Sequence, residues 1–258
     1  GEWGRWRPLA QGPKMERLRS IVEKHTPVLY LHPHDKFMPA PVEWYLERCR
    51  LVSSAGVVLL DYGEVDASSL ASAESTFGAD AGLTLRCQES AYRGSPPGSL
   101  ASVPIYATTK VVHDPRRGRE VLEVTYMTFY PYNGSYKILP GVRAGAHEAD
   151  WEHFSMRVDP ADGELLSVYY NAHRNVDGTW REGARVARSP CGRPAVYVAK
   201  HGHGHYPAPG VWHRLCFFAN DHCSNRGPVW RPQTVALLPV SPATLSLLQR
   251  HGGAGGEA

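Results

Sequence analysis

The stretch "GAHEADWEH", residues 145–153, concentrates acidic and imidazole side chains in one short segment. In an extended strand successive side chains point to opposite faces, so Asp150 and Glu152 project together while Trp151 and His153 project the other way. Two carboxylates on an inward face need a positive partner, because an ionised group loses several kcal/mol of solvation in an apolar interior. His147, three residues before Asp150, can turn back to the same point. The stretch therefore predicts a His, Asp, Glu cluster able to hold a cation.

A second set of imidazoles lies in "KHGHGHYPAPG", which directly follows the apolar run "AVYVA". If the strand continues into it, His201, His203 and His205 share one face and Lys200 points to the other. The alternating glycines allow sharp departures that gather imidazoles around one ion. The alternative is that these histidines are exposed loop residues that chelate metal only at the surface.

Together the two clusters predict a divalent metal site at the strand ends of one domain. The predicted ligands are carboxylates and imidazoles from both clusters: His147, Asp150, Glu152, His201 and His203. A mixture of these ligand types favours Zn, Mn or Fe, and Mg fits when fewer imidazoles bind. The candidates for a general acid or base are nearby titratable side chains: His153, His173 and Lys200.

Two further groups are weaker candidates. The stretch "HPHD", residues 32–35, follows a predicted strand, and its simplest role is to cap that strand and turn the loop; the alternative is that it reaches the metal site. The tyrosines between residues 126 and 136 line a ligand groove or pack in the sheet, and packing is the commoner role of tyrosine on a half-buried strand.

The elements that position these residues are mostly strands. Short β-branched or aromatic runs, separated by clusters such as "DPRRG" and "NVDG", predict strands within residues 105–113, 120–130, 151–159, 164–174, 195–201, 214–220 and 233–240. Repeated short strands with hairpin turns and few helices predict a mainly β fold, an antiparallel β-sandwich or partly closed barrel with long irregular loops.

The N-terminal part carries the helical signals. Residues 14–25 have apolar positions at helical spacing, and Pro27 prevents continuation. A strand at 28–31, a helical turn at 41–48 and an irregular connection at 64–100 with one short helix near 68–75 follow. The expected organisation is an N-terminal helical segment (1–25), a single β-sandwich domain (26–245) and a disordered tail (246–258).

Composition limits the function classes. The formal charge of +3 is scattered, and the basic face that nucleic-acid binding requires is missing from the pattern. No run approaches the roughly 20 apolar residues of a membrane span, so we expect a soluble, cytoplasmic protein, or a secreted one if a signal has been removed. The five cysteines are too irregular for a disulfide scaffold; Cys216 and Cys223 are either buried thiols or one loop disulfide.

In order along the chain, "LYLHPHDKFMPAPVEWYL", "TFYPYNG", "AHEADWEHFSMRVD", "GELLSVYYNAH" and "VYVAKHGHGHYPAPG" resemble the vacuolar protein sorting-associated protein 62 family. The resemblance covers most of residues 26–240, and it includes the H-x-x-D-W-E-H and K-H-G-H strings. His34 and His205 are additions of this sequence. The family name implies a link to vacuolar traffic.

A shorter resemblance is to the necrosis-inducing cytolysins of plant pathogens, β-sandwich proteins whose Gly-His-Arg-His-Asp-Trp-Glu heptapeptide supplies ligands to a divalent cation. Here Ala146, Glu148 and Ala149 replace the Gly, the Arg and the second His, whereas the His, Asp and Glu types that hold the cation remain. The replacements argue against cytolytic activity more than against the metal site.

These observations lead to three hypotheses. The first is a divalent-metal-dependent enzyme of unknown substrate, in which the metal activates water or binds substrate. The second is a metal-dependent module that binds a lipid or a glycan, cytolysin-like and linked to membrane traffic. The third is a cation that only ties the sandwich together. The expected partners are a small-molecule, lipid or glycan ligand and a peripheral membrane contact, with no nucleic acid.

Overall fold

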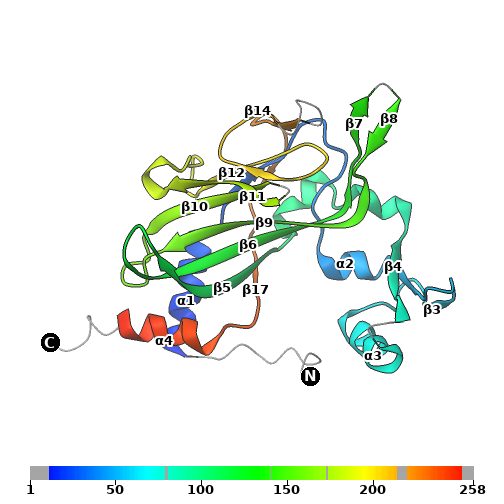
Figure 1. Ribbon diagram of the computed structural model, residues 1–258, viewed down its shortest axis with the longest axis horizontal. Helices are drawn as coiled ribbons and strands as arrows, with labels where there is room; N and C mark the ends of the chain where they lie inside the picture. Colours follow the sequence, from blue (N-terminus) through cyan, green and yellow to red (C-terminus); the bar gives the residue numbers. More distant parts are fainter. Residues whose placement is uncertain (1–11, 79–80, 140, 173, 214–219, 252–258) are drawn as a thin grey trace.

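The computed structural model describes residues 12–78, 81–139, 141–172, 174–213 and 220–251. Its largest element is a six-stranded sheet in the order β11-β10-β9-β6-β5-β17 (Figure 1). The strands of this sheet are β5 (Ile105–Asp114), β6 (Arg119–Asn133), β9 (His147–Val158), β10 (Leu165–Ala172), β11 (Arg174–Glu182) and β17 (Val235–Leu237). Five of them lie in chain order across the sheet and pair antiparallel, whereas β17 joins β5 in parallel.

A four-stranded sheet in the order β13-β12-β1-β16 packs against the large sheet. Its strands are β1 (Val28–Tyr30), β12 (Ala195–Val198), β13 (His205–Tyr206) and β16 (Val229–Trp230). Side chains of both sheets, such as Tyr126 and Phe154 from one and Val196 and Trp230 from the other, form one buried core. The predicted mainly β, sandwich-like fold is confirmed, but it is not purely antiparallel, because β1 and β12 pair in parallel. These two strands lie far apart in sequence, and no hairpin dictates their direction.

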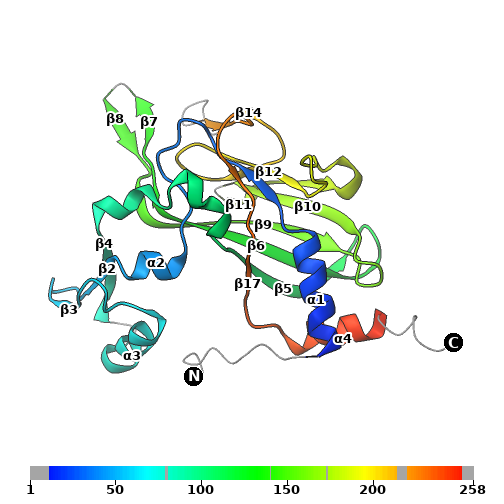
Figure 2. The same cartoon turned by 180° about the vertical axis from the view of Figure 1, so that it is seen from behind.

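Two helices lie along the large sheet where β5 and β6 run (Figure 2). The expected helix at 14–25 is confirmed as α1 (Pro13–Lys24), which buries Met15, Leu18, Ile21 and Val22. The second is α4 (Pro242–His251), which contacts both α1 and β5. Residues 246–251 were expected to belong to a disordered tail, and instead they form the last turns of α4 because Leu247 and Leu248 are buried in the core.

A smaller layer forms around a second apolar cluster, to one side of the large sheet (Figure 1). It contains the three-stranded sheet β3-β2-β4, made of β2 (Cys49–Val52), β3 (Val58–Leu60) and β4 (Thr84–Cys87), with α2 (Val42–Leu46), α3 (Ala67–Phe77) and the 3-10 helices η2 (Glu89–Arg93) and η3 (Pro97–Ser102). The short helix expected near 68–75 is confirmed as α3, and the turn at 41–48 as α2. The expectation that 64–100 is otherwise irregular is wrong at β4, whose "TLRC" is too short to show a strand period.

The remaining elements are two small two-stranded sheets and a 3-10 helix. They are β7 (Tyr136–Leu139) with β8 (Val142–Ala144), β14 (Gly210–Trp212) with β15 (Asp221–Cys223), and η4 (Gly183–Arg185). None of the helices in the described ranges is long and apolar enough to cross a membrane. The strand expected at 214–220 lies outside the described ranges except for its last residue, and so does Cys216, so the expected pairing of Cys216 with Cys223 is not tested.

Candidate ligand site at the ends of β1 and β12

Four buried or half-buried side chains meet where the parallel strands β1 and β12 end. Asp35 lies in the loop after β1, and His203 lies in the loop after β12. Tyr130 and Asp150 come from β6 and β9 of the facing sheet, where they are direct cross-strand partners. We call these four residues the His203 centre. It forms because both loops fold over the same end of the large sheet.

The imidazole of His203 is held on three sides. Its Nδ1 lies 2.7 Å from Asp150 Oδ2, and its Nε2 lies 3.6 Å from Asp35 Oδ2. Its ring stacks on the ring of Tyr130 with centroids 3.7 Å apart and an interplanar angle of 4°. The side chains of His203, Asp35 and Asp150 are 1%, 3% and 7% exposed, so these charges and dipoles act in a largely water-excluded space.

The backbone of the histidine segment forms a tight loop instead of an extended strand. The strand β12 ends at Val198, and hydrogen bonds from His203 N to Ala199 O and from Ala199 N to Gly204 O close the loop. His201 and His203 have φ values of 73° and 53°, which cost energy for residues that carry a Cβ. The expectation that His201, His203 and His205 share one strand face is therefore wrong.

Asp35 fixes this loop through its backbone amides. Its Oδ2 accepts a hydrogen bond from His201 N at 2.8 Å, and its Oδ1 accepts one from Phe37 N at 3.0 Å. Gly202 is needed for steric reasons, since a Cβ there would lie 1.8 Å from the hydroxyl oxygen of Tyr136. The loop that presents His203 is thus fixed by a carboxylate on one side and by close packing on the other.

The unusual feature of the centre is His203 Nε2, a buried nitrogen that makes no hydrogen bond to any part of the chain that the structure describes. A carboxylate that accepts from Nδ1 fixes the tautomer whose Nε2 carries a lone pair, an arrangement common among metal-bound histidines. Nε2 and Asp35 Oδ2 can share one cation, because bonds of about 2.1 Å to each allow separations of up to about 4.2 Å. Within the described ranges, no group of three or more His, Cys, Asp or Glu side chains is placed to hold a metal ion. The chain thus offers two facing donors, and the predicted five-ligand cage is not formed.

The predicted ligands are only partly brought together. His147 Nε2 is 3.8 Å from Asp150 Oδ1, but its side chain is 54% exposed. Glu152 is buried on the same face of β9 as Asp150, as the strand period predicted. The ring of His201 instead packs near Phe37 and Tyr136, with its Nδ1 buried and unpartnered among the described residues. The histidine that meets the carboxylate is therefore His203, whereas His201 packs near aromatic rings.

Of the predicted acid–base residues, the structure describes His153 and Lys200, and neither is a member of the His203 centre. His153 lies on the opposite face of β9 from Asp150, beside Asn171 Nδ2 at 3.4 Å, and burial lowers its pKa. Lys200 donates its backbone N–H to His222 O. It lies near His201, whose pKa is lowered chiefly by burial, against the opposing charge of Asp35 and with a smaller contribution from the charge of Lys200. His173 falls outside the described residues.

His205, two residues after His203, is a core histidine. Its Nε2 lies 3.3 Å from Thr128 Oγ1 and its Nδ1 lies 3.2 Å from His153 O, and no carboxylate of the described residues is bonded to the ring. Burial lowers the pKa of His205 to about 3, so the ring is neutral at physiological pH. It fills the sandwich and leaves ligand contacts to His203.

Sequence reasoning ranked two members of the centre too low. Asp35 was a minor candidate and Tyr130 was expected to pack in the sheet, yet both lie against His203. The signal for Asp35 was present in "HPHD", because that stretch leaves β1 at the same sheet end at which the histidine loop leaves β12. That signal becomes readable only when the parallel pairing of β1 with β12 is known.

Comparison with known protein families gives one extended match. The family described as vacuolar protein sorting-associated protein 62 matches residues 7–214 of this chain. A curated member, vacuolar protein sorting-associated protein 62 of Saccharomyces cerevisiae, is 24% identical over 234 residues, which cover 81% of this chain and 50% of the relative. The chain thus spans about half the length of the curated relative it matches.

Comparison with solved structures gives looser matches. A structure described as "Toxin fold for microbial attack and plant defense" matches with a TM-score of 0.42 and 10% identity, covering 97% of this chain and 87% of that one. A structure of NLPPya in complex with mannosamine matches with a TM-score of 0.40 and 10% identity, covering 97% and 86%. The necrosis and ethylene inducing protein 2 from the causal agent of witches' broom disease of cocoa has a TM-score of 0.36 and 11% identity, covering 91% and 77%. With TM-scores below 0.5, these likenesses carry no argument about the site.

Proposed function

The chain belongs to the vacuolar protein sorting-associated protein 62 family, and we propose that it is a metal-dependent binding module whose His203 centre receives a divalent cation. The cation bridges the protein to an oxygen-rich ligand, a lipid head group or a glycan. The chain spans about half the length of its curated relative, so the relative's role is not carried over as a fact. We include a role in vacuolar sorting as part of this proposal.

The observation that supports the proposal most strongly is the unpartnered Nε2 of His203, buried and facing Asp35 Oδ2 at 3.6 Å. A buried polar atom without a partner costs about 1–3 kcal/mol, so its persistence calls for a ligand or a counter-charge. The left-handed backbone of His203 adds a second cost at the same residue. Strain and an unsatisfied nitrogen at one position are typical of a site whose purpose is binding.

The donor set determines the kind of cation and of ligand. One imidazole nitrogen and one carboxylate oxygen suit Zn, Mn or Fe, and Mg is less favoured because it prefers an all-oxygen shell. A cation held by two protein donors keeps at least half of its coordination positions for water or for ligand oxygens. Asp150 would act behind His203 by holding its Nδ1, and His147 would stand at the exposed rim beside Asp150.

Binding is a better proposal than catalysis for this geometry. The sequence hypothesis of an enzyme required His153, His173 or Lys200 beside the metal as an acid or base. The side chain of His153 projects from the other face of β9. Within the described part of the chain, Lys200 forms no ion pair with the carboxylates of the centre, and its backbone N–H donates to His222 O. The proposed role of the centre is therefore to hold a cation and its ligand.

The direct test is a titration of Zn²⁺ and Mn²⁺ into chelator-stripped protein, followed by isothermal calorimetry. The His203→Gln and Asp35→Asn variants should bind at least tenfold more weakly, because each loses one of the two facing donors. The matched control is His113→Gln, which removes an exposed imidazole on β5. Equal affinity in wild type and in a folded His203→Gln variant would overturn the proposal.

The ligand is tested by flotation with vesicles of anionic phospholipid or of glycolipid, with and without EDTA. We expect vesicle binding that EDTA abolishes and that His203→Gln also abolishes. Binding that survives both EDTA and the substitution would place the membrane contact elsewhere. If the protein binds the metal but no vesicles, the proposed cation site stands and the proposed lipid ligand is wrong.

A further inference from the structure

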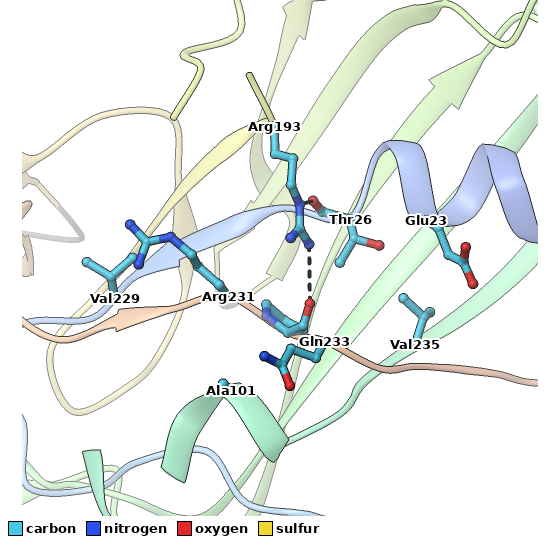
Figure 3. A pocket seen from close by; sticks show the side chains of 9 residues that line it. Glu23, Thr26, Ala101, Arg193, Val229, Arg231, Gln233 and Val235 are labelled. Atoms are coloured by element: carbon cyan, nitrogen blue, oxygen red, sulfur yellow. Dashed lines mark hydrogen bonds between the residues drawn. The ribbon is translucent and has the colours of Figure 1, made fainter. Parts of the chain in front are cut away.

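A second site lies where β1 and β12 begin, at the opposite end of the parallel pair from the His203 centre. It is a cleft of about 610 Å³ between the end of α1, η3 and the segment that follows β16 (Figure 3). Ligand sites in proteins span about 300–1,000 Å³. The polar side chains that line it are Glu23, Thr26, Arg193, Arg231 and Gln233. We call it the arginine cleft.

Arg193 is a half-buried cation bound only to neutral groups. Its Nε donates to Thr26 O, and its Nη2 lies 3.4 Å from both Pro27 O and Pro232 O. Its Nη1 makes no hydrogen bond, and its guanidinium forms no ion pair, with any residue that the structure describes. One edge of the guanidinium therefore holds the backbone while the other edge is left for a ligand.

Arg231 adds a second positive charge without an acidic partner. It is exposed, and it forms no ion pair within the described part of the chain. Burial, and to a smaller extent the charge of Arg231, lowers the pKa of Arg193. Two guanidinium groups in one cleft repel each other, and the single acid in the lining, Glu23, is exposed and forms no described ion pair with either. The cleft therefore keeps an excess of positive charge beside a partly desolvated cation.

We propose that the arginine cleft binds a phosphate-bearing ligand, whose oxygens accept hydrogen bonds from the Nη1 edge of Arg193 and from Arg231. A phosphate monoester carries a charge of about −1.5 to −2 and three acceptor oxygens, which matches two guanidinium groups better than a carboxylate does. Gln233, two residues after Arg231, also lines the cleft, and its side chain points toward Ala101 (Figure 3). The anion relieves the repulsion between the arginines and replaces the water that burial has removed from Arg193.

The two arginines have separable roles, and this makes the proposal testable. Arg193 also holds three backbone carbonyls, so its replacement disturbs the fold. Arg231 forms no described contact that holds the structure, so its replacement removes charge alone. The informative variant is Arg231→Gln, with Arg185→Gln as a matched control, because Arg185 is also an exposed arginine without a described polar contact.

The experiment titrates inorganic phosphate, and acetate at equal ionic strength, into the protein in the presence of EDTA, so that the His203 centre does not contribute. Calorimetry should show phosphate binding that Arg231→Gln weakens at least tenfold and Arg185→Gln leaves unchanged, with acetate bound at least tenfold more weakly. A phosphate affinity that is equal in Arg231→Gln and wild type, or equal to that of acetate, would overturn the proposal.

A second experiment distinguishes a lipid phosphate from a soluble phosphate ester as the ligand. Protein is sedimented with vesicles containing phosphatidic acid, and with phosphatidylcholine vesicles as the neutral control. Binding to phosphatidic acid that Arg231→Gln abolishes identifies a lipid phosphate as the ligand, whereas binding of free phosphate alone identifies a soluble phosphate ester. Absence of both overturns the proposal, and it has no bearing on the cation centre, which His203→Gln tests separately.

Discussion

The two ends of the parallel pair β1 and β12 carry opposite chemistry. Where the strands begin, the neighbouring segments present backbone carbonyls, and Arg193 satisfies them with its N–H groups. Where the strands end, the following loops present backbone amides, and Asp35 satisfies those of His201 and Phe37 with its carboxylate. Each end thus needs a charged side chain to complete its backbone hydrogen bonds, and the sign of that charge follows from which backbone group is unpaired.

This difference teaches how a small sheet can create two sites of opposite preference. A charged side chain that binds the backbone also places its charge at the end of the sheet. A neighbouring side chain then lies beside that charge, and together they attract a ligand whose charge is opposite to that of the backbone-binding residue. At one end His203 stands between two carboxylates and suits a cation. At the other end Arg231 stands beside Arg193 and suits an anion. The comparison predicts that the backbone-holding residue matters most for stability and its neighbour mostly for binding.

The largest expected loss of stability is at the basic end, the end of the β1–β12 pair that carries Arg193 and Arg231. Arg193→Met, which keeps an unbranched apolar side chain, should lower the free energy of unfolding by about 3 kcal/mol, because three backbone carbonyls lose their donor. Arg231→Met should change it by less than about 0.5 kcal/mol. Urea denaturation in phosphate-free buffer measures both. Similar losses of unfolding free energy in the two variants would show that Arg193 does not differ from Arg231 in stabilising the backbone.

The loss of unfolding free energy should be somewhat smaller at the acidic end, the end of the β1–β12 pair that carries Asp35. Asp35→Ala leaves two loop amides without an acceptor and should cost about 2 kcal/mol, measured by urea denaturation in EDTA. Asp35→Asn keeps one acceptor oxygen and should cost roughly half as much. If Asp35→Ala is as stable as wild type, the loop does not depend on this carboxylate. The two ends would then not share the property that a charged side chain stabilises the backbone.

The smallest effect concerns pH. His25, at the basic end next to Thr26, is 2% exposed and has no carboxylate hydrogen-bond partner, and burial lowers its pKa. Its folded-state pKa lies below the unfolded value of about 6.5, so the stability it contributes is present above that value and is lost as the pH falls below it. Removing the group with His25→Gln should therefore flatten the dependence of unfolding free energy on pH between 7 and 5.

The pH effect has a fixed upper limit, since one proton changes stability by at most about 1.4 kcal/mol per pH unit. Thermal or urea unfolding at a series of pH values measures the slope. His113→Gln, at an exposed imidazole, serves as the control and should leave the slope as in wild type. An unchanged slope in His25→Gln would show that His25 is not a neutral group of the folded core.

Elements with a strong internal period could be predicted from the sequence, and those created by distant contacts could not. The helix α1 and the inward face of β9 follow from the spacing of their own apolar residues. The strand β4 and the helix α4 depend on surfaces supplied by other parts of the chain. For the site, the structure brings Asp150 of "HEADWEH" into contact with His203 of "KHGHGH", but His201 does not share the face of His203 because the loop leaves the extended conformation.

The sequence by itself determined the inventory: a mainly β chain with Asp150 and Glu152 on one strand face, and a glycine-rich histidine segment at the end of another strand. Local spacing is enough for that, because alternation along a strand is a property of the backbone alone. Only the tertiary structure decided that His203 meets Asp150, that Asp35 completes the centre and that Arg193 forms no ion pair with the residues described. Those relations depend on the parallel pairing of β1 with β12, two strands separated by most of the chain, and no local period encodes that contact.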